Sequence, residues 1–197
     1  MSDKYPEQLS RLQKPDEREI PRELQDLFDQ HVEDQLKNWG FINNLFKVLP
    51  LNPWQYKGFL DFKASLFSPE TCYLSNADKE MIGLIVSSTN NCSYCLTTHS
   101  DVLRGLTGDP VFVDKLTYNY RSVELTEKQR ALCDYAYFAT VYPREIDAKQ
   151  IEHLREAGFN DHEILEAAYI VGFFNYTNRW VSTIAPIANA GHFSHNR

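Results

Sequence analysis

Residues 75–105 read SNADKEMIGLIVSSTNNCSYCLTTHSDVLRG, and this stretch sets the expected fold class. Ser75 to Asp78 has the composition of a helix start, and apolar residues at helical spacing follow it. Asn90-Asn91 is a turn signal, and asparagine or serine there can cap a second helix that runs towards Gly105. The stretch therefore predicts two helices that reverse direction at the asparagine pair.

Helical signals also dominate the rest of the chain. Apolar residues between Leu24 and Leu36 recur at three- and four-residue steps, which predicts an amphipathic helix ending near Gly40. Asn52-Pro53 predicts the start of an aromatic-rich helix. Further starts are marked by the capping-box pairs Thr126 with Gln129, Asp147 with Gln150, and Asn160 with Glu163.

The last of these pairs opens a long helix, 161–183, that is apolar on most sides and is expected to lie at the centre of the molecule. No segment shows the two-residue period of a strand between hairpin turns. The sequence therefore predicts an all-α fold, a single-domain helical bundle.

Length and charge limit the organisation of the chain and its partners. The 197 residues suffice for one domain, expected over 22–197, behind an extended N-terminal arm, 1–21, that is either frayed or packed on a neighbouring subunit. A net charge of -7 argues against binding to nucleic acid or to an anionic membrane. No secretory signal is evident, so a cytoplasmic location is expected. In that reducing compartment, a close cysteine pair is typical of catalysis or metal binding.

Cys92 and Cys95 form such a pair, and His99 follows one helical turn later. Steps of three and four residues place the three side chains on one helix face. A helix N-terminus and a neighbouring histidine both stabilise a thiolate. Cys95 has both influences available, so it is the better candidate nucleophile, and Cys92 is the better resolving partner.

Glu80 joins this group by a geometric argument. If the chain reverses at the asparagine pair, Glu80 and His99 lie at similar heights on antiparallel helices, where a carboxylate could orient the imidazole. A glutamate on a helix more often belongs simply to a solvated face. The residues alone leave both interpretations open.

Metal binding is the main alternative for the cysteine pair. One C-x-x-C with one histidine supplies three ligands, whereas a structural zinc site needs four. His192 and His195 could contribute, but a tail pair is expected to be exposed to solvent. Cys133 lies in an apolar helical stripe and is expected to be a core residue, and Cys72 has no partner at useful spacing. No metal ion and no cofactor is expected.

Glu80, Cys92, Cys95 and His99 at this spacing resemble the active-site pattern of the alkyl hydroperoxidase D-like proteins, in the carboxymuconolactone decarboxylase superfamily. The peroxidase-related branch is the most similar, and the stretch 172–179 also resembles it. The resemblance covers roughly residues 40–190.

The resemblance implies an all-helical fold that assembles as homotrimers or homohexamers, and a thiol peroxidase acting in antioxidant defence. Cys95 would attack a small hydroperoxide, Cys92 would then form a disulfide with it, and an external dithiol or protein reductant would restore the pair. His99 and Glu80 would form the proton relay.

Tyr94 departs from the family pattern, which has a histidine immediately before the second cysteine. A tyrosine cannot serve as a base near neutral pH. Two other functions use the same cysteine pair: a protein disulfide reductase, and a redox sensor without turnover.

Overall fold

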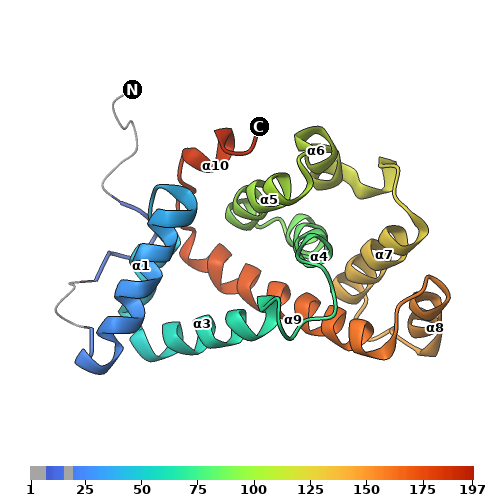
Figure 1. Ribbon diagram of the computed structural model, residues 1–197, viewed down its shortest axis with the longest axis horizontal. Coiled ribbons are helices and arrows are strands. Elements are labelled where there is room, and N and C mark those ends of the chain that lie inside the picture. The colour runs from blue at the N-terminus through green and yellow to red at the C-terminus, as the bar shows by residue number, and fades with distance from the viewer. Residues whose placement is uncertain (1–7, 16–19) are drawn as a thin grey trace.

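The computed structural model describes residues 8–15 and 20–197, and within these residues it contains α-helices and short 3-10 helices but no β-strand. The all-α prediction is confirmed. Figure 1 shows the arrangement of the helices. Their bounds are α1 (Gln25–Trp39), α2 (Asn44–Val48), α3 (Pro53–Phe67), α4 (Asn76–Thr89), α5 (Ser93–Thr107), α6 (Pro110–Asn119), α7 (Glu127–Val141), α8 (Ala148–Glu156), α9 (Asp161–Ile184) and α10 (Gly191–Ser194).

The predicted helix starts are reproduced by side-chain caps at most positions. All three capping boxes are present, at the starts of α7, α8 and α9. The Ser75 hydroxyl accepts a hydrogen bond from the backbone N–H of Asp78, 3.1 Å away, and so begins α4. Gly40 ends α1 in the left-handed conformation, with φ of 73°, as a residue without a Cβ can do at low cost.

Two predicted caps differ from the structure. Asn52 occupies the cap position of α3, but its side chain makes no capping hydrogen bond. The cap of α5 is Cys92 and not an asparagine, because Asn91 takes a left-handed conformation, with φ of 54°, that completes the turn. The helix also runs past Gly105 and ends at Thr107, where Gly108 supplies the left-handed residue.

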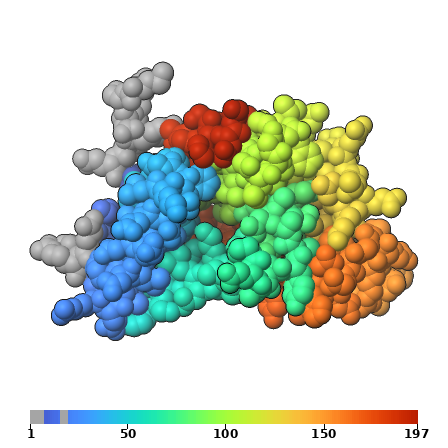
Figure 2. Space-filling model, viewed as in Figure 1, coloured from blue at the N-terminus to red at the C-terminus, as the bar shows by residue number. Residues whose placement is uncertain are grey.

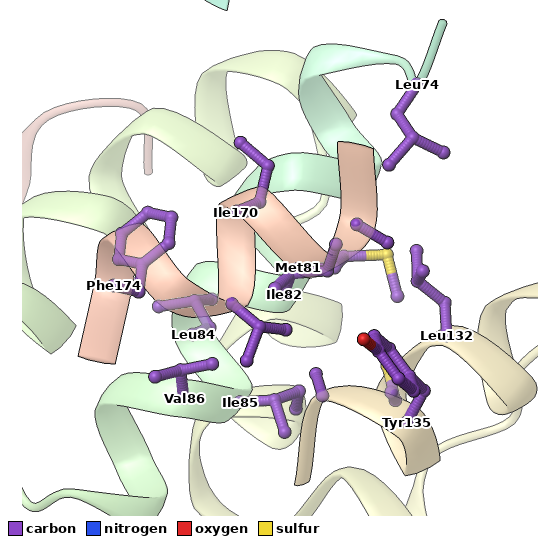
Figure 3. Packing of buried hydrophobic residues seen from close by; sticks show 14 of the residues in the cluster. Leu74, Met81, Ile82, Leu84, Ile85, Val86, Leu132, Tyr135, Ile170 and Phe174 are labelled. Atoms are coloured by element: carbon purple, nitrogen blue, oxygen red, sulfur yellow. The ribbon is translucent and has the colours of Figure 1, made fainter. Parts of the chain in front are cut away.

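Helix α4 is the most enclosed element of the fold. It packs against α5, α6, α7 and α9, and every residue from 79 to 87 is buried. Figure 3 shows its apolar side chains meeting those of α7 and α9 in the main core. A Cβ on Gly83 of α4 would collide with the ring of Phe174, so this glycine permits the close approach of α9.

The long helix α9 crosses the molecule, as Figure 1 shows, but only part of its surface is buried. Three large residues on it are more than half exposed, namely Leu165, Tyr169 and Tyr176. The prediction of a long helix is therefore confirmed, whereas the enclosed central position belongs to α4.

One buried ion pair joins α4 to α9. The Lys79 ammonium is fully buried and lies 3.0 Å from a carboxylate oxygen of Glu166. The other oxygen of Glu166 accepts hydrogen bonds from the backbone N–H groups of Tyr73 and Leu74. Burial alone would raise the pKa of Glu166, but these bonds and those from Cys72 and Lys79 hold that pKa below its usual value.

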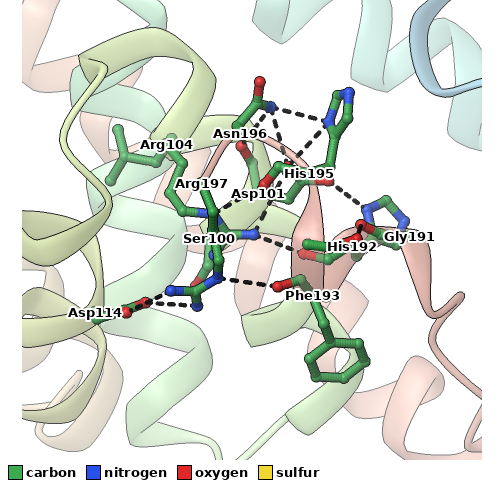
Figure 4. A network of polar contacts seen from close by, with 12 residues as sticks. Ser100, Asp101, Arg104, Asp114, Gly191, His192, Phe193, His195, Asn196 and Arg197 are labelled. Carbon is green, nitrogen blue, oxygen red and sulfur yellow. Dashed lines mark hydrogen bonds and ion pairs between the residues drawn. The ribbon is translucent and has the colours of Figure 1, made fainter.

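The C-terminal segment is anchored to α5 by a buried polar network, drawn in Figure 4. Asp101 is inaccessible to solvent, and its carboxylate accepts hydrogen bonds from His192, at 2.8 Å, and from Asn196, at 3.0 Å. The second ring nitrogen of His192 contacts Asn43, just before α2. The expectation that His192 is exposed is wrong, because its ring is buried between α5 and the start of α2, whereas His195 is partly exposed.

The N-terminal arm predicted over 1–21 falls partly outside the described residues, which omit 1–7 and 16–19. Residues 8–15 contact the end of α9 and the segment that follows it. The backbone N–H of Arg11 bonds to the carbonyl of Ile184, and that of Ile187 bonds to the carbonyl of Leu9. In the described part of the chain, no helix has the length and apolarity needed to span a membrane.

Candidate active site

The cysteine pair lies at the start of α5, immediately after the turn that leaves α4. Cys92 caps the helix and Cys95 is its third residue, so their Cα atoms are 5.3 Å apart and their sulfur atoms lie at disulfide distance. This Cα separation is within the range that a disulfide accepts. The predicted proximity of the two thiols is confirmed.

Asparagines of α9 hold this turn in place. The side-chain amide of Asn90 donates hydrogen bonds to the side-chain oxygens of Asn175 and Asn178, each at 3.1 Å. Asn178 in turn donates to the hydroxyl of Ser87 in α4. The stretch 172–179 therefore contributes to the site by fixing the α4–α5 turn that precedes the cysteine pair.

Glu80 and His99 meet across the helical hairpin, as the antiparallel argument predicted. Nδ1 of His99 is 2.7 Å from Oε2 of Glu80, and the carboxylate is almost fully buried. A ring nitrogen that faces a carboxylate carries the proton, so Nδ1–H donates and Nε2 remains available as a base. The edge of the imidazole packs on Phe174, with ring centres 4.7 Å apart, which fixes its orientation. Glu80 is thus not a solvated surface residue.

A cavity of about 470 Å³ lies beside these residues, between the N-terminal helices and α5 and α9. Figure 2 shows the face of the molecule hollowed between α1 and α5, with α9 visible behind. The walls are mainly apolar and include the aromatic side chains Phe46, Phe59, Phe67, Phe173 and Trp180. This volume falls in the range of pockets that bind small organic molecules.

The two cysteines differ in their access to this cavity. Cys95 lines the wall together with Glu80 and His99, whereas Cys92 is not among the lining residues. Tyr94 also lines it, and burial raises the pKa of its phenol, an effect that the Leu45 backbone opposes. The phenol therefore stays protonated at neutral pH. Only Cys95 of the pair can meet a molecule that enters the cavity.

The remaining cysteines lie away from this site. Cys133 is in the main core, as predicted, and burial raises the pKa of its thiol to about 12. Cys72 is partly buried before α4, and its sulfur lies 3.2 Å from the carbonyl oxygen of Leu66. Within residues 8–15 and 20–197, no group of three or more His, Cys, Asp or Glu side chains is arranged to hold a metal ion.

Two titratable residues of the cavity were not predicted to belong to the site. His31 of α1 has an unpaired buried Nε2, and burial, reinforced by the charge of Lys63, lowers the pKa of its imidazole to about 4. Lys63 of α3 lines the same cavity. Neither has a recognisable spacing to Cys95 along the chain, so only the tertiary fold brings them to the site.

Several solved structures share the fold of this chain. A peroxidase-related protein from Silicibacter sp. TM1040 is 34% identical over 98% of both chains, with a TM-score of 0.87. An alkylhydroperoxidase AhpD core, a peroxidase-related protein from Ralstonia eutropha JMP134, is 28% identical over 96% of this chain and 97% of its own, with a TM-score of 0.89. The debrominase Bmp8 shares the fold at 19% identity over 94% of both chains, with a TM-score of 0.73. No family model and no curated protein sequence matches the chain.

Proposed function

The chain belongs to the alkyl hydroperoxidase D-like superfamily, with peroxidase-related proteins as its relatives, and we propose that it is a thiol-dependent peroxidase. Its substrates are hydrogen peroxide or organic hydroperoxides, and its role is antioxidant defence. One observation carries the proposal: Cys95 lines the same cavity as the hydrogen-bonded Glu80–His99 pair, whereas its partner Cys92 does not line it.

The reaction begins when His99 takes the proton of the reduced Cys95 thiol. Nε2 is the accepting atom, since Nδ1 is held by Glu80. The third position of α5 also favours the thiolate, because the helix N-terminus carries partial positive charge. The Glu80 carboxylate stabilises the imidazolium that forms, so it acts on the reaction through His99.

The thiolate then attacks the terminal oxygen of a hydroperoxide. A sulfur–oxygen bond forms and the oxygen–oxygen bond breaks, so that Cys95 becomes a sulfenic acid. The leaving alkoxide or hydroxide takes up one proton and departs as an alcohol or water. The Cys92 thiol displaces the sulfenic oxygen as water and forms the disulfide with Cys95. The 5.3 Å separation of the Cα atoms favours this step without rearrangement of the helix.

An external dithiol, small or carried by a protein, completes the cycle by thiol–disulfide exchange. The disulfide gains two electrons and two protons, and the reductant becomes a disulfide. This requirement for a reductant agrees with the cytoplasmic location expected from the sequence.

The direct test is hydroperoxide consumption that depends on an added dithiol. The parent protein should turn over with at least one of the lipoamide, thioredoxin or glutathione systems, and Cys95→Ser should abolish turnover. Cys72→Ser is the matched control, because that thiol lies outside the cavity, and it should keep the parental rate. Undiminished consumption by Cys95→Ser would refute the proposal. Disulfide reduction without peroxide turnover would point to the reductase alternative.

A further inference from the structure

The cavity holds a lysine that the peroxidase mechanism above does not use. Of the described residues that line the cavity, Lys63 is the only lysine or arginine. Its Nζ is 5.7 Å from the centre of the Phe46 ring, a distance at which an aromatic face attracts a cation. Within residues 8–15 and 20–197 no carboxylate lies within 4.0 Å of this ammonium group.

The electrostatic surroundings of Lys63 make its proton easier to release. Burial lowers the pKa of the ammonium group, and the negative charge of Glu80 on α4 opposes that effect. On α1, His31 is neutral near pH 7, since its pKa is lowered to about 4, and Asp34 is exposed at the rim. His99 on α5 is bound to Glu80. Lys63 thus faces the cavity with a proton and without a fixed ionic partner.

Cleavage of the oxygen–oxygen bond releases an alkoxide, which needs a proton to leave as an alcohol. The attack on a peroxide is an in-line displacement, so the leaving alkoxide departs from the side opposite the sulfur atom. His99 lies one helical turn from Cys95 on the same helix, on the sulfur side, where it receives the thiol proton. Lys63 lines the same cavity but comes from α3, so it can approach the alkoxide from a helix other than the one that carries the sulfur and His99.

We propose that Lys63 is a catalytic residue of this reaction, the general acid that protonates the alkoxide leaving group. The proposal rests on the proposed peroxidase function. As the Cys95 sulfur forms its bond to the terminal oxygen, the electron pair of the oxygen–oxygen bond goes to the alkoxide, and the Lys63 ammonium gives it a proton. The sulfur loses two electrons, the peroxide gains two, and the Lys63 amine regains its proton from solvent.

The test uses two oxidants of similar size whose leaving groups differ in basicity. Ethyl hydroperoxide expels ethoxide, which needs a proton, whereas peracetic acid expels acetate, which needs none near pH 7. We would measure the rate of Cys95 oxidation in a single turnover of reduced protein. Lys63→Met should slow the reaction with ethyl hydroperoxide by about 100-fold or more, the usual contribution of a general acid, and change that with peracetic acid less than about threefold.

Two further variants separate acid catalysis from other roles of Lys63. Lys57→Met is the matched control, because Lys57 lies on the same helix but pairs with Asp61 at the surface, and it should react like the parent with both oxidants. Lys63→Arg keeps the positive charge but cannot release a proton, so it should remain slow with ethyl hydroperoxide alone.

Three outcomes would overturn the assignment of Lys63. If Lys63→Met slows the reactions with both oxidants equally, the role of Lys63 is structural. If Lys63→Met reacts at the parental rates, another group supplies the proton. If Lys63→Arg restores the parental rate with ethyl hydroperoxide, only the charge of the side chain matters. These outcomes differ from a failure of the peroxidase function itself, in which the parent protein reacts with neither oxidant or Cys95→Ser reacts as fast as the parent.

Discussion

Glu80 and His99 form the contact on which the chemistry at the cysteine pair depends. The carboxylate is buried and touches the imidazole at 2.7 Å, so its negative charge is weakly screened by water. Because Nδ1 faces this carboxylate, Nε2 is the ring nitrogen that can receive the proton of the thiol. Glu80 is therefore a positioning residue that acts through His99.

Glu80→Gln tests this role at the scale of one residue. The amide preserves the size of the side chain but removes its charge, so we expect the rate of Cys95 oxidation to fall by about 10- to 100-fold. The rate would be measured in a single turnover at several pH values, and the rise of rate with pH should shift in the variant. Glu124→Gln, at an exposed position, is the control. An unchanged rate and pH profile in Glu80→Gln would contradict the relay.

The helices around these residues are joined by a buried ion pair in addition to extensive apolar packing. Helix α4 brings Glu80 to the site, and the same helix is joined to α9 by the buried pair of Lys79 and Glu166. A buried ammonium group that loses its partner keeps the cost of desolvation without the compensating attraction. The position of α4 therefore depends on Glu166 as well as on apolar packing.

Glu166→Gln should lower the free energy of unfolding by about 3–5 kcal/mol, because it leaves Lys79 buried and unpaired. Urea denaturation at neutral pH, with the dependence on urea concentration unchanged, measures this loss. The exposed pair of Lys57 and Asp61 provides the comparison, and Asp61→Asn should cost less than about 1 kcal/mol. Equal effects of the two substitutions would show that burial does not govern the pair.

Local sequence signals predicted most of the elements, because helix caps and apolar spacing depend on neighbouring residues. The three capping boxes and the placement of Cys92, Cys95 and His99 on one helix are of this kind. The position of Cys92 as the cap of α5 was not predictable, because the side chain of Asn90 forms hydrogen bonds with Asn175 and Asn178 of α9 instead of capping α5. Contacts across 85 and 88 residues have no signature in a local window.

At the scale of the whole molecule, the N-terminal helices form one wall of the cavity beside the cysteine pair. This wall could not be predicted from the sequence. Lys63 and His31 come from helices whose sequence patterns describe only which face is apolar. His192 was misjudged for the same reason: its burial follows from Asp101 on α5 and from Asn43 before α2, both distant along the chain. The residues that form the walls of the cavity are thus determined by tertiary packing, whereas the reactive thiol could be predicted from the local spacing of the cysteines and His99.

The half-buried imidazole of His31 predicts how the stability of the molecule depends on pH. Its pKa is about 4 in the folded state and about 6.5 in the unfolded chain, so the unfolded state binds more protons between these values. The free energy of unfolding should therefore fall as pH drops from about 6.5 to 4, by up to about 1.4 kcal/mol per pH unit. In urea titrations, His31→Leu should flatten this decline and His153→Leu, at an exposed position, should not. Parallel curves for His31→Leu and the parent would contradict this assignment.

Assembly is a second prediction at this scale. The family resemblance implies homotrimers or homohexamers, so sedimentation equilibrium should give a mass of three or six chains of 22.9 kDa each. Because oxidation is confined to the start of α5 in each chain, we expect the same mass with reduced and oxidised cysteines. A monomer at micromolar concentration would contradict the assembly.

The identity of the attacking sulfur is the central claim, and trapping its sulfenic acid tests it most directly. Cys92→Ser removes the resolving thiol, so one equivalent of hydroperoxide should leave a sulfenic acid that cannot form the disulfide. After reaction with dimedone and proteolysis, mass spectrometry should find one adduct per chain, on Cys95. An adduct on Cys72 or Cys133 instead, or none while hydroperoxide is consumed, would contradict the mechanism.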